Sequence, residues 1–300
     1  MKEEKMTNIR WLKIVGTLAF TLALTLPGLA GAQKAFDSPQ AAVDALVDSV
    51  ARQDNAQLRD ILGPDYRQLI SLDELSTEDR YDFLAAWAKG HRIVRDNERK
   101  ARLELNGAWT LPVPIVQTGK GWKFDTLAGI KEMHTRRVGR NELAAIQSLH
   151  AYVDAQREYA LKDRDGDGVP SYAQKILSSP GKKDGLSWPT TAGEPESPLG
   201  PLFEAKDLKD GYHGYRFRIL KAQGPAAQGG ARNYVKGGQM TEGFALVAWP
   251  ARYGETGVMT FMVNQDGAIY QKHLGPRSSA IAGVMERFNP DASWQVVSQP

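Results

Sequence analysis

The chain contains no cysteine among its 300 residues. This absence excludes disulfides, thiolate nucleophiles, thiolate zinc sites and iron–sulfur clusters. An excess of charge of one sign is also lacking, because 38 Lys and Arg residues oppose 35 Asp and Glu residues, for a formal net charge of +3. Without a basic stripe that carries interleaved aromatic residues, the sequence predicts no nucleic-acid partner. Stability must therefore come from packed apolar cores, which a chain of this length can build.

The apolar run Ile14–Leu26 is shorter than the roughly 20 residues that a membrane span requires. It follows the cations Arg10 and Lys13 and precedes Ala30–Ala32, whose small side chains suit a signal peptidase. We therefore predict that residues 1–32 are a secretory signal peptide, with an uncleaved anchor as the alternative. The mature protein is then periplasmic or secreted and has no stable membrane span. No cysteine follows the small residues, which excludes a lipoprotein anchor.

Residues 36–130 carry helix signals first and strand signals afterwards. Ser38-Pro39 and the capping-box pattern Ser76-x-x-Asp79 each predict the start of a helix, and a short helix is expected between them at Asn55–Leu62. Three strand-like runs follow, at Ala101–Leu105, Trp109–Gln117 and Gly121–Asp125. We expect an α+β domain that resembles the nuclear-transport-factor-2-like or cystatin-like folds. Such folds often hold a concave pocket, which Trp87, Trp109 and Trp122 would line.

Residues 139–300 predict a second α+β domain, reached through a basic, glycine-containing joint at Arg136–Arg140. Asn141 is expected to cap a long helix whose apolar stripe runs from Leu143 to Tyr159. A Pro- and Gly-rich loop over residues 178–214 follows, with Trp188, Leu199 and Leu202 as expected anchors. The rest predicts a β-meander, a short helix and a last strand. These elements are expected at Tyr215–Ala222, Gly243–Trp249, Gly257–Asn264, Ala268–His273, Arg277–Phe288 and near Trp294.

The strand expected at Gly257–Asn264 is apolar on both alternating faces, so it should be central and covered twice. The fold class predicted from the whole chain is therefore α+β, with helices packed on antiparallel sheets in two domains.

Several runs resemble the bacterial exported proteins of domain-of-unknown-function family 2950. They are Gly139-Arg-Asn-Glu-Leu-Ala-Ala-Ile, Tyr152-Val-Asp-Ala-Gln-Arg-Glu-Tyr, Asp163-Arg-Asp-Gly-Asp-Gly, Ser197-Pro-Leu-Gly-Pro and Gly243-Phe-Ala-Leu-Val-Ala-Trp-Pro. The resemblance covers essentially the whole mature chain. It implies a cell-envelope location and no assigned activity.

The second half is also similar, more distantly, to the head domains of type IV pilins and pseudopilins. The similarity lies in Ala145-Ile-x-Ser-Leu, Gly211-Tyr-x-Gly-Tyr-x-Phe, Tyr253-Gly-x-Thr-Gly and Asp266-Gly-x-Ile-Tyr. Those heads pack one helix against an antiparallel sheet. In a pilin the hydrophobic segment runs directly into the head helix, whereas here the whole first domain intervenes. The resemblance therefore implies the architecture of the head and not assembly through a pilin stalk.

The acidic run from Asp163 to Gly168 offers oxygen ligands at Asp163, Asp165 and Asp167, followed by a glycine for the turn. This is the pattern that Ca²⁺ requires. The carbonyl of Val169 and the side chains of Ser171 and Gln174 would complete the set. Gln174 stands where the standard loop has a bidentate Glu, so the sequence predicts weak Ca²⁺ binding, and a plain solvated turn is the alternative.

No other motif points to chemistry, and no catalytic or cofactor-binding residue is predicted. The five histidines show no ligand spacing, and neither a G-x-S-x-G elbow nor a P-loop is present. A polar cluster of Tyr212, His213, Tyr215, Arg216 and Arg218 at a strand start is a weaker candidate site.

Three functional hypotheses follow from the sequence. The first is a non-enzymatic protein that binds an envelope protein or surface component, with an optional structural Ca²⁺. The second is an exported hydrolase that uses carboxylates such as Asp125 or Glu158 between the domains. The third is a small-molecule-binding protein with its site in the N-terminal pocket.

Overall fold

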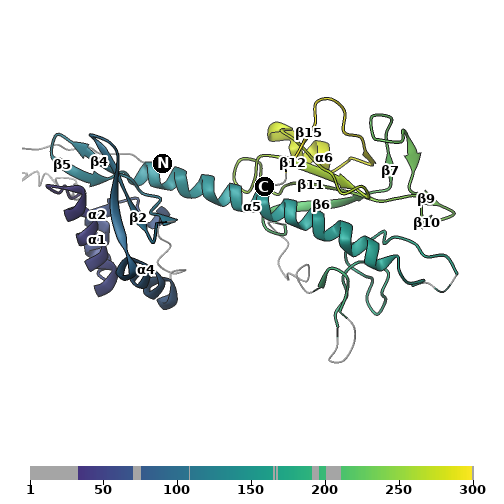
Figure 1. Ribbon diagram of the computed structural model, residues 1–300, viewed down its shortest axis with the longest axis horizontal. Helices are drawn as coiled ribbons and strands as arrows, with labels where there is room; N and C mark the ends of the chain where they lie inside the picture. Colours follow the sequence, from purple (N-terminus) through teal and green to yellow (C-terminus); the bar gives the residue numbers. More distant parts are fainter. Residues whose placement is uncertain are drawn as a thin grey trace, which may run out of the picture.

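The computed structural model describes residues 33–69, 76–107, 109–164, 166, 168–190, 196–200 and 211–298, so the predicted signal peptide lies outside the described residues. Helices and antiparallel sheets make an α+β fold, as the sequence predicts. The buried apolar side chains form two clusters, one on residues 36–124 and one on residues 145–288. We call the parts around them the N-terminal lobe and the C-terminal lobe. Helix α5 (Thr126–Tyr159) joins the two lobes (Figure 1).

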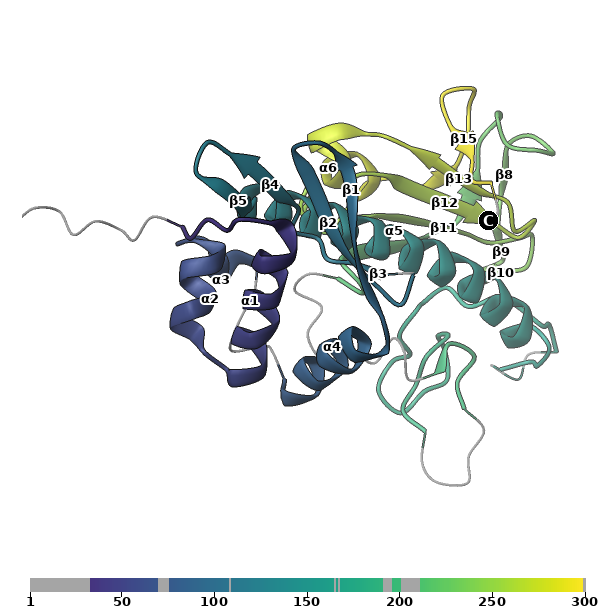
Figure 2. The same cartoon turned by 60° about the vertical axis from the view of Figure 1, so that its left-hand side comes forward.

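The helices of the N-terminal lobe begin at the residues that the caps predict. Ser38 accepts a hydrogen bond from the Ala41 N–H, and Ser76 and Asp79 form a complete capping box. The four helices are α1 (Pro39–Arg52), α2 (Asn55–Leu62), α3 (Tyr66–Leu69) and α4 (Thr77–Lys89). Helices α1, α2 and α4 lie together beside the strands (Figure 2).

The N-terminal sheet has the strand order β1-β2-β4-β5, with β3 also paired to β2. Its strands are β1 (His91–Asn97), β2 (Lys100–Leu105), β3 (Trp109–Thr110), β4 (Ile115–Thr118) and β5 (Gly121–Phe124). The single strand predicted over Trp109–Gln117 is wrong, because the chain leaves the ladder between β3 and β4. Pro112 and Pro114 lie in this break, where neither needs a backbone N–H.

The structure has a continuous helix, α5, where the sequence predicts a joint between the two halves of the chain. It is continuous for 34 residues, so Arg136–Arg140 is helical and Asn141 is not a cap. The true N-cap is Asp125, whose carboxylate accepts the Ala128 N–H. Asn141 instead donates from Nδ2 to the Thr256 carbonyl at 2.9 Å. Leu143 is 58% exposed and so does not belong to the buried stripe.

The C-terminal sheet has the strand order β15-β13-β12-β11-β6. Its strands are β6 (Tyr215–Leu220), β11 (Ala245–Pro250), β12 (Thr260–Asn264), β13 (Ile269–Lys272) and β15 (Gln295–Val296). Strand β12 is central and all five of its residues are buried, which confirms the expectation from its two apolar faces. The second half of α5 packs on β11 and β12, and α6 (Ser278–Ala282) packs on β11.

Short elements surround this sheet. The helix predicted over Arg277–Phe288 is too long, because only the 3-10 turn η2 (Gly275–Arg277) and α6 are helical before β14 (Arg287–Phe288) begins. Strand β14 lies beside β7 (Ala222–Gln223), which pairs in turn with β8 (Arg232–Asn233). Strands β9 (Val235–Lys236) and β10 (Gln239–Met240) form a separate hairpin.

The segment after α5 folds back on the side of the helix away from the sheet (Figure 1). The fully buried amide of Gln156 holds it there: its Nε2 donates to the Ala173 carbonyl and its Oε1 accepts the Ala173 N–H, both at 2.8 Å. Trp188 and Leu199 are buried, as expected of anchors, whereas Leu202 lies outside the described residues.

Replacing Gly139 with alanine should stabilise the protein. Gly139 lies inside α5 and no atom lies within 4 Å of the position that a Cβ would take. Alanine there should raise the free energy of unfolding by about 0.5–1 kcal/mol, because glycine loses more backbone entropy in a helix. Urea denaturation of the variant measures the change.

Gly129 supplies the matched control on the same helix. A Cβ there would lie 2.7 Å from Val113 Cγ2, so Gly129→Ala should destabilise the protein. A loss of stability on Gly139→Ala would contradict a continuous helix and favour the joint.

Candidate ligand-binding pocket

The N-terminal lobe contains a cavity of about 650 Å³ whose lining is mostly apolar. Helices α1, α2, α3 and α4 contribute to its wall, together with the segment around Pro112 and the first part of α5. The side chains that make it apolar include Leu46, Leu58, Phe83, Trp109, Val113 and Met133. Its volume lies within the range of about 300–1,000 Å³ typical of small-molecule sites.

The packing of α4 accounts for the hollow. This helix carries Phe83, Leu84 and Trp87, yet none of its residues is buried. By contrast α1 and α2 bury Val43, Leu46, Leu58 and further apolar residues in the core. Space is therefore left beneath the Phe83 face of α4.

A cation lines this apolar space. Arg80, in the first turn of α4, lines the cavity, and its Nε is buried without a hydrogen-bond partner in the part of the chain that the structure describes. An unpaired buried donor costs about 1–3 kcal/mol. A ligand acceptor placed beside Arg80 would remove that cost. Arg137 of α5 also lines the cavity and is exposed.

Among the residues that the structure describes, the remaining polar lining consists of amides and one carboxylate. The amides are those of Gln53, Asn55 and Gln68. The carboxylate belongs to Asp79, which accepts hydrogen bonds from the Ser76 hydroxyl and backbone N–H at 2.6 and 2.9 Å. These hydrogen bonds hold the pKa of Asp79 below its usual value. The carboxylate is thus ionised and engaged in the helix cap, so Arg80 and Arg137 are the groups suited to an anion.

The structure brings one of the three predicted tryptophans to the cavity. Trp109 lines it. Trp87 instead stacks on His91, with ring centroids 3.3 Å apart, and Trp122 is a core residue of β5 that is 5% exposed.

Sequence reasoning missed Arg80, although a signal for it exists. Arg80 stands three and seven residues before Phe83 and Trp87, a spacing that puts a cation in line with the apolar stripe of a helix. A cation at such a position has to snorkel to solvent or find an anion.

Part of the predicted Ca²⁺ turn is described. Asp163 Oδ1 accepts the Gly166 N–H at 2.8 Å, and Oδ2 accepts the Gly168 N–H at 2.7 Å. Asp165 and Asp167 lie outside the described residues. Among the described residues no three His, Asp or Glu side chains form a metal-binding group.

The other predicted Ca²⁺ ligands follow the same segment. Val169 is exposed, and Ser171 and Gln174 line a second cavity, in the C-terminal lobe. The Gln174 Nε2 donates to the Gly238 carbonyl at 2.7 Å, which turns this side chain toward the β9–β10 hairpin.

The weaker candidates are dispersed. Tyr215 points inward, and its hydroxyl donates to the Met259 carbonyl, whereas Arg216 and Arg218 are exposed on the other face of β6. Burial raises the pKa of Tyr215 above its usual value. His213 lies edge-on to Tyr212, with ring centroids 4.3 Å apart. The five residues therefore do not converge on one site.

The two carboxylates considered for hydrolysis are also far apart. Asp125 caps the start of α5 and Glu158 is exposed in its last turn. An α-helix rises about 1.5 Å per residue, so roughly 50 Å separates them along the axis. They cannot act as a pair.

No helix among residues 33–298 that the structure describes is long and apolar enough to cross a membrane. No curated protein and no solved structure matches the chain, so its similarity to pilin heads stays a prediction. Residues 33–297 match the family of proteins of unknown function termed DUF2950. This match spans nearly the whole chain after the predicted signal peptide, and the protein therefore belongs to the DUF2950 family.

Proposed function

We propose that the protein is an exported, non-enzymatic binding protein whose N-terminal cavity holds an amphipathic molecule with an anionic group. The observation that carries this proposal is the Nε of Arg80, which lies in a mostly apolar cavity and has no hydrogen-bond partner among the described residues. The apolar portion of such a ligand would bury against Leu58, Phe83 and Val113. Burial of apolar surface contributes about 25 cal/mol per Å², so an acyl chain or ring system supplies most of the affinity.

The anionic group of the ligand would meet Arg80. A guanidinium presents several N–H donors in a planar fork that matches a carboxylate or a phosphate. In a partly enclosed site such charge-assisted hydrogen bonds are stronger than neutral ones. Binding is favoured over catalysis because a guanidinium and amides hold a ligand but supply neither a nucleophile nor a general base.

The envelope location rests on residues 1–32. The cations, the apolar run and the small residues before Gln33 occur in the order of a secretory signal. A protein delivered beyond the inner membrane would meet lipids and their fragments, which are molecules of the proposed chemistry. We propose the resemblance to a pilin head for the architecture of the C-terminal lobe only, and not for assembly.

A saturated fatty acid should bind the mature chain, residues 33–300, and Arg80 should recognise its carboxylate. In a displacement titration with a fluorescent fatty-acid analogue, we expect the acid to bind about tenfold more tightly than the alcohol of equal length, because charge-assisted hydrogen bonds contribute about 1.5–3 kcal/mol. Arg80→Gln should remove this difference. Arg99→Gln is the matched control, since Arg99 is exposed in the same lobe outside the cavity lining.

A second variant tests the cavity independently of charge. Leu111 lines the cavity and is partly buried, so Leu111→Trp should fill it and weaken the acid and the alcohol alike. Thermal unfolding of each variant confirms that it is folded. Equal binding of acid and alcohol to the unmodified chain, or unchanged binding after Leu111→Trp, would sink the proposal.

If the protein is exported, residues 1–32 should be cleaved from it. Cells that express the chain with a C-terminal tag should yield a product outside the cytoplasm that begins at Gln33, as read by intact mass. Leu24→Arg places a cation in the apolar run, where insertion costs about 2.5–3.5 kcal/mol, and should leave the full-length chain in the cytoplasm. Leu24→Ile should be processed normally. A full-length cytoplasmic product from the unmodified chain would contradict export.

Weak Ca²⁺ binding is a separate proposal, supported by the acidic, glycine-containing run from Asp163 to Gly168. Titration calorimetry on the mature chain should give a Kd of about 10⁻⁴–10⁻³ M, as for extracellular Ca²⁺ modules. Asp163→Asn should weaken binding about tenfold or more, because it removes a charge from the ligand set. Asp154→Asn, which changes an exposed carboxylate on α5, should have no effect. The absence of heat at millimolar Ca²⁺ would argue for a plain turn.

A further inference from the structure

The apolar lining of the N-terminal cavity continues onto the surface of the molecule. Leu46, Leu58 and Val113 line its interior and are only 4–5% exposed. Trp109 and Met133 line the same cavity, yet they are 45% and 38% exposed. Since these two side chains both line the cavity and meet solvent, they lie at its mouth.

A hydrogen bond ties together the two elements that carry these side chains. Arg136 Nη1 donates to the Thr110 carbonyl at 2.7 Å, and its Nε contacts Glu132 Oε1 at 2.8 Å. Thr110 follows Trp109 in β3. Arg136 lies three residues after Met133 in α5, which is less than one turn of the helix. Strand β3 and this turn of α5 therefore meet at the mouth of the cavity.

Two half-buried residues, Leu111 and Pro112, extend this apolar surface. They follow β3 in the chain and also line the cavity. We call Trp109, Leu111, Pro112 and Met133 the apolar rim. Arg137, which is exposed, lies one turn after Met133 on α5 and lines the cavity as well. The mouth thus presents an indole ring and aliphatic groups beside a long cationic side chain.

These side chains suit the interface of a phospholipid bilayer. Tryptophan is enriched at membrane–water interfaces, where its ring is buried while its N–H stays near the headgroups. Methionine is flexible and apolar, so it adapts to an irregular surface. Arginine can lay its aliphatic stem along apolar surface while its guanidinium reaches a lipid phosphate. Exposed apolar side chains next to one another mark an interaction site more often than isolated ones do.

We propose that the apolar rim docks on the surface of a phospholipid bilayer, from which the N-terminal cavity takes up its ligand. This inference rests on the proposed function, in which the ligand is an amphipathic molecule with an anionic group. The apolar part of such a ligand is poorly soluble, because water disfavours exposed apolar surface. A docked rim would let it pass from the acyl chains, along Trp109 and Met133, into the space lined by Leu58 without crossing water.

Co-sedimentation with vesicles of phosphatidylcholine and phosphatidylglycerol tests the docking. The mature chain should sediment with the vesicles. Trp109→Ser/Met133→Ser should raise the lipid concentration needed for half-maximal binding about tenfold, because two apolar side chains no longer bury surface in the bilayer. Thermal unfolding of the variant confirms that it is folded.

The matched control removes one aromatic and one aliphatic side chain elsewhere in the same lobe. Tyr81 and Leu127 are 67% and 62% exposed and lie outside the cavity lining. On α4, Tyr81 is about 200° around the helix from both Asp79 and Phe83, so it points away from the cavity that they line. Tyr81→Ser/Leu127→Ser should leave vesicle binding unchanged. Neither double variant alters the charge, so general electrostatic attraction affects both equally.

A second measurement uses the emission of the protein itself. Phosphatidylcholine with brominated acyl chains quenches a tryptophan that enters the bilayer, so vesicles that contain it should reduce the fluorescence of the mature chain. Trp109→Phe keeps an apolar ring at the rim. This variant should still sediment with vesicles, but it should lose most of the quenching.

Several results would overturn the proposal. They are a mature chain that stays in the supernatant, equal weakening by the two double variants, and quenching of Trp109→Phe as strong as that of the unmodified chain. A dimer in solution that only Trp109→Ser/Met133→Ser dissociates would also overturn it, because a second copy would then cover the rim. Fatty-acid binding is measured without vesicles. If it persists when vesicle binding fails, the docking surface alone is wrong, whereas its absence contradicts the proposed function.

Discussion

The whole structure depends on one helix that belongs to two hydrophobic cores. Isolated helices are marginal in water, and most helical stability in proteins comes from packing an apolar face. The first turns of α5 pack in the N-terminal lobe, where Gly129 lies against Val113. Its second half buries Leu149, Tyr152 and Val153 against the C-terminal sheet. Between these parts the helix has no core of its own, so each lobe stabilises one end of the same element.

Polar side chains fix how α5 sits in the C-terminal lobe. Glu142 accepts the backbone N–H groups of Val258 and Met259 at 2.9 and 3.0 Å, and Gln156 pairs with both backbone groups of Ala173. An unsatisfied buried donor or acceptor is costly, so these contacts select one rotation and one height of the helix. Apolar packing alone would tolerate small shifts. The second cavity, in the C-terminal lobe, depends on this fit, because the segment that pairs with Gln156 forms part of its wall.

The sequence correctly predicts those helices and strands whose signals are local. Caps at Ser38 and Ser76, and the doubly apolar strand around Met262, give the right element at the right place. Strand β1 escapes notice because it is mostly polar and partly or fully exposed along its length. The helical state of Arg136–Arg140 also escapes notice, since a glycine among cations reads locally as a break while the two flanking cores impose the helix.

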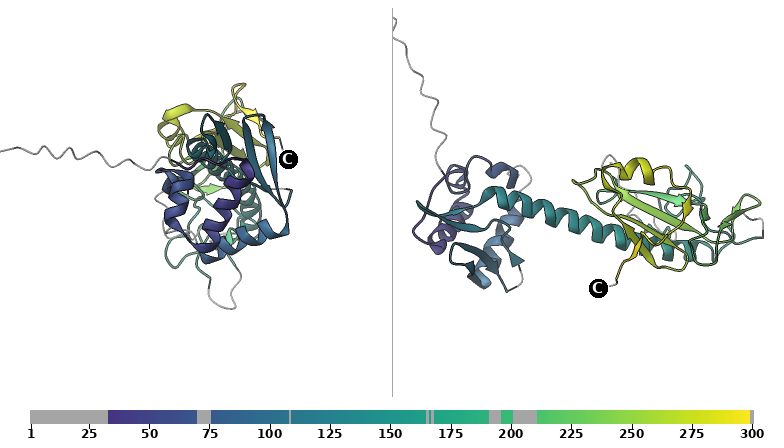
Figure 3. Two further views of the ribbon diagram at one scale, coloured as in Figure 1. Left: turned by 90° about the vertical axis from the view of Figure 1, so that its left-hand side faces the viewer. Right: turned by 90° about the horizontal axis from the view of Figure 1, so that it is seen from above.

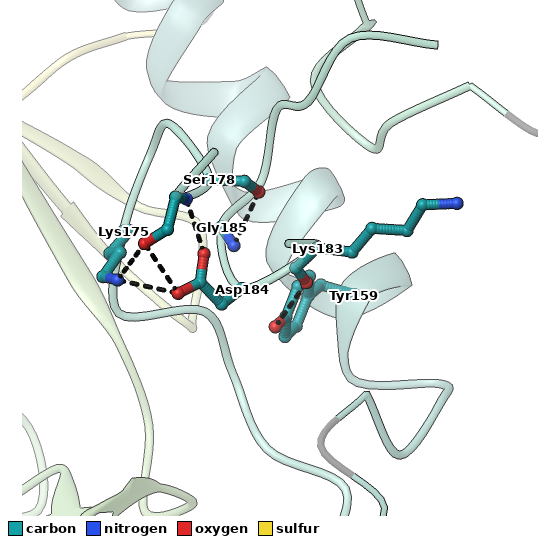
Figure 4. Close-up of polar contacts among 7 residues, drawn as sticks. Tyr159, Lys175, Ser178, Lys183, Asp184 and Gly185 are labelled. Carbon is teal, nitrogen blue, oxygen red and sulfur yellow. Dashed lines mark hydrogen bonds and ion pairs between the residues drawn. The ribbon is translucent and has the colours of Figure 1, made fainter. Parts of the chain in front are cut away.

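The candidate sites illustrate the same limit. The sequence suggests Trp109 as a lining residue because it is one of three tryptophans in the first domain. Which of the three lines the cavity depends on the packing of α4, which has no buried residue. The residues that line the second cavity come from several separate parts of the sequence, so no local pattern predicts them. The carboxylate of Asp184 accepts hydrogen bonds from Lys175 and Ser179 of its own segment (Figure 4). Its role in holding this segment together cannot be predicted from the sequence alone.

A continuous helix between two sites fixes the distance between them. Figure 3 shows α5 running straight from one lobe into the other. Arg137 lines the first cavity and Tyr159 the second, and at about 1.5 Å per residue the helix holds them roughly 33 Å apart along its axis. One residue inserted into its exposed middle would turn one cavity by about 100° around the axis relative to the other. The number of residues in α5 therefore determines both the distance between the two cavities and their relative orientation around the helix axis.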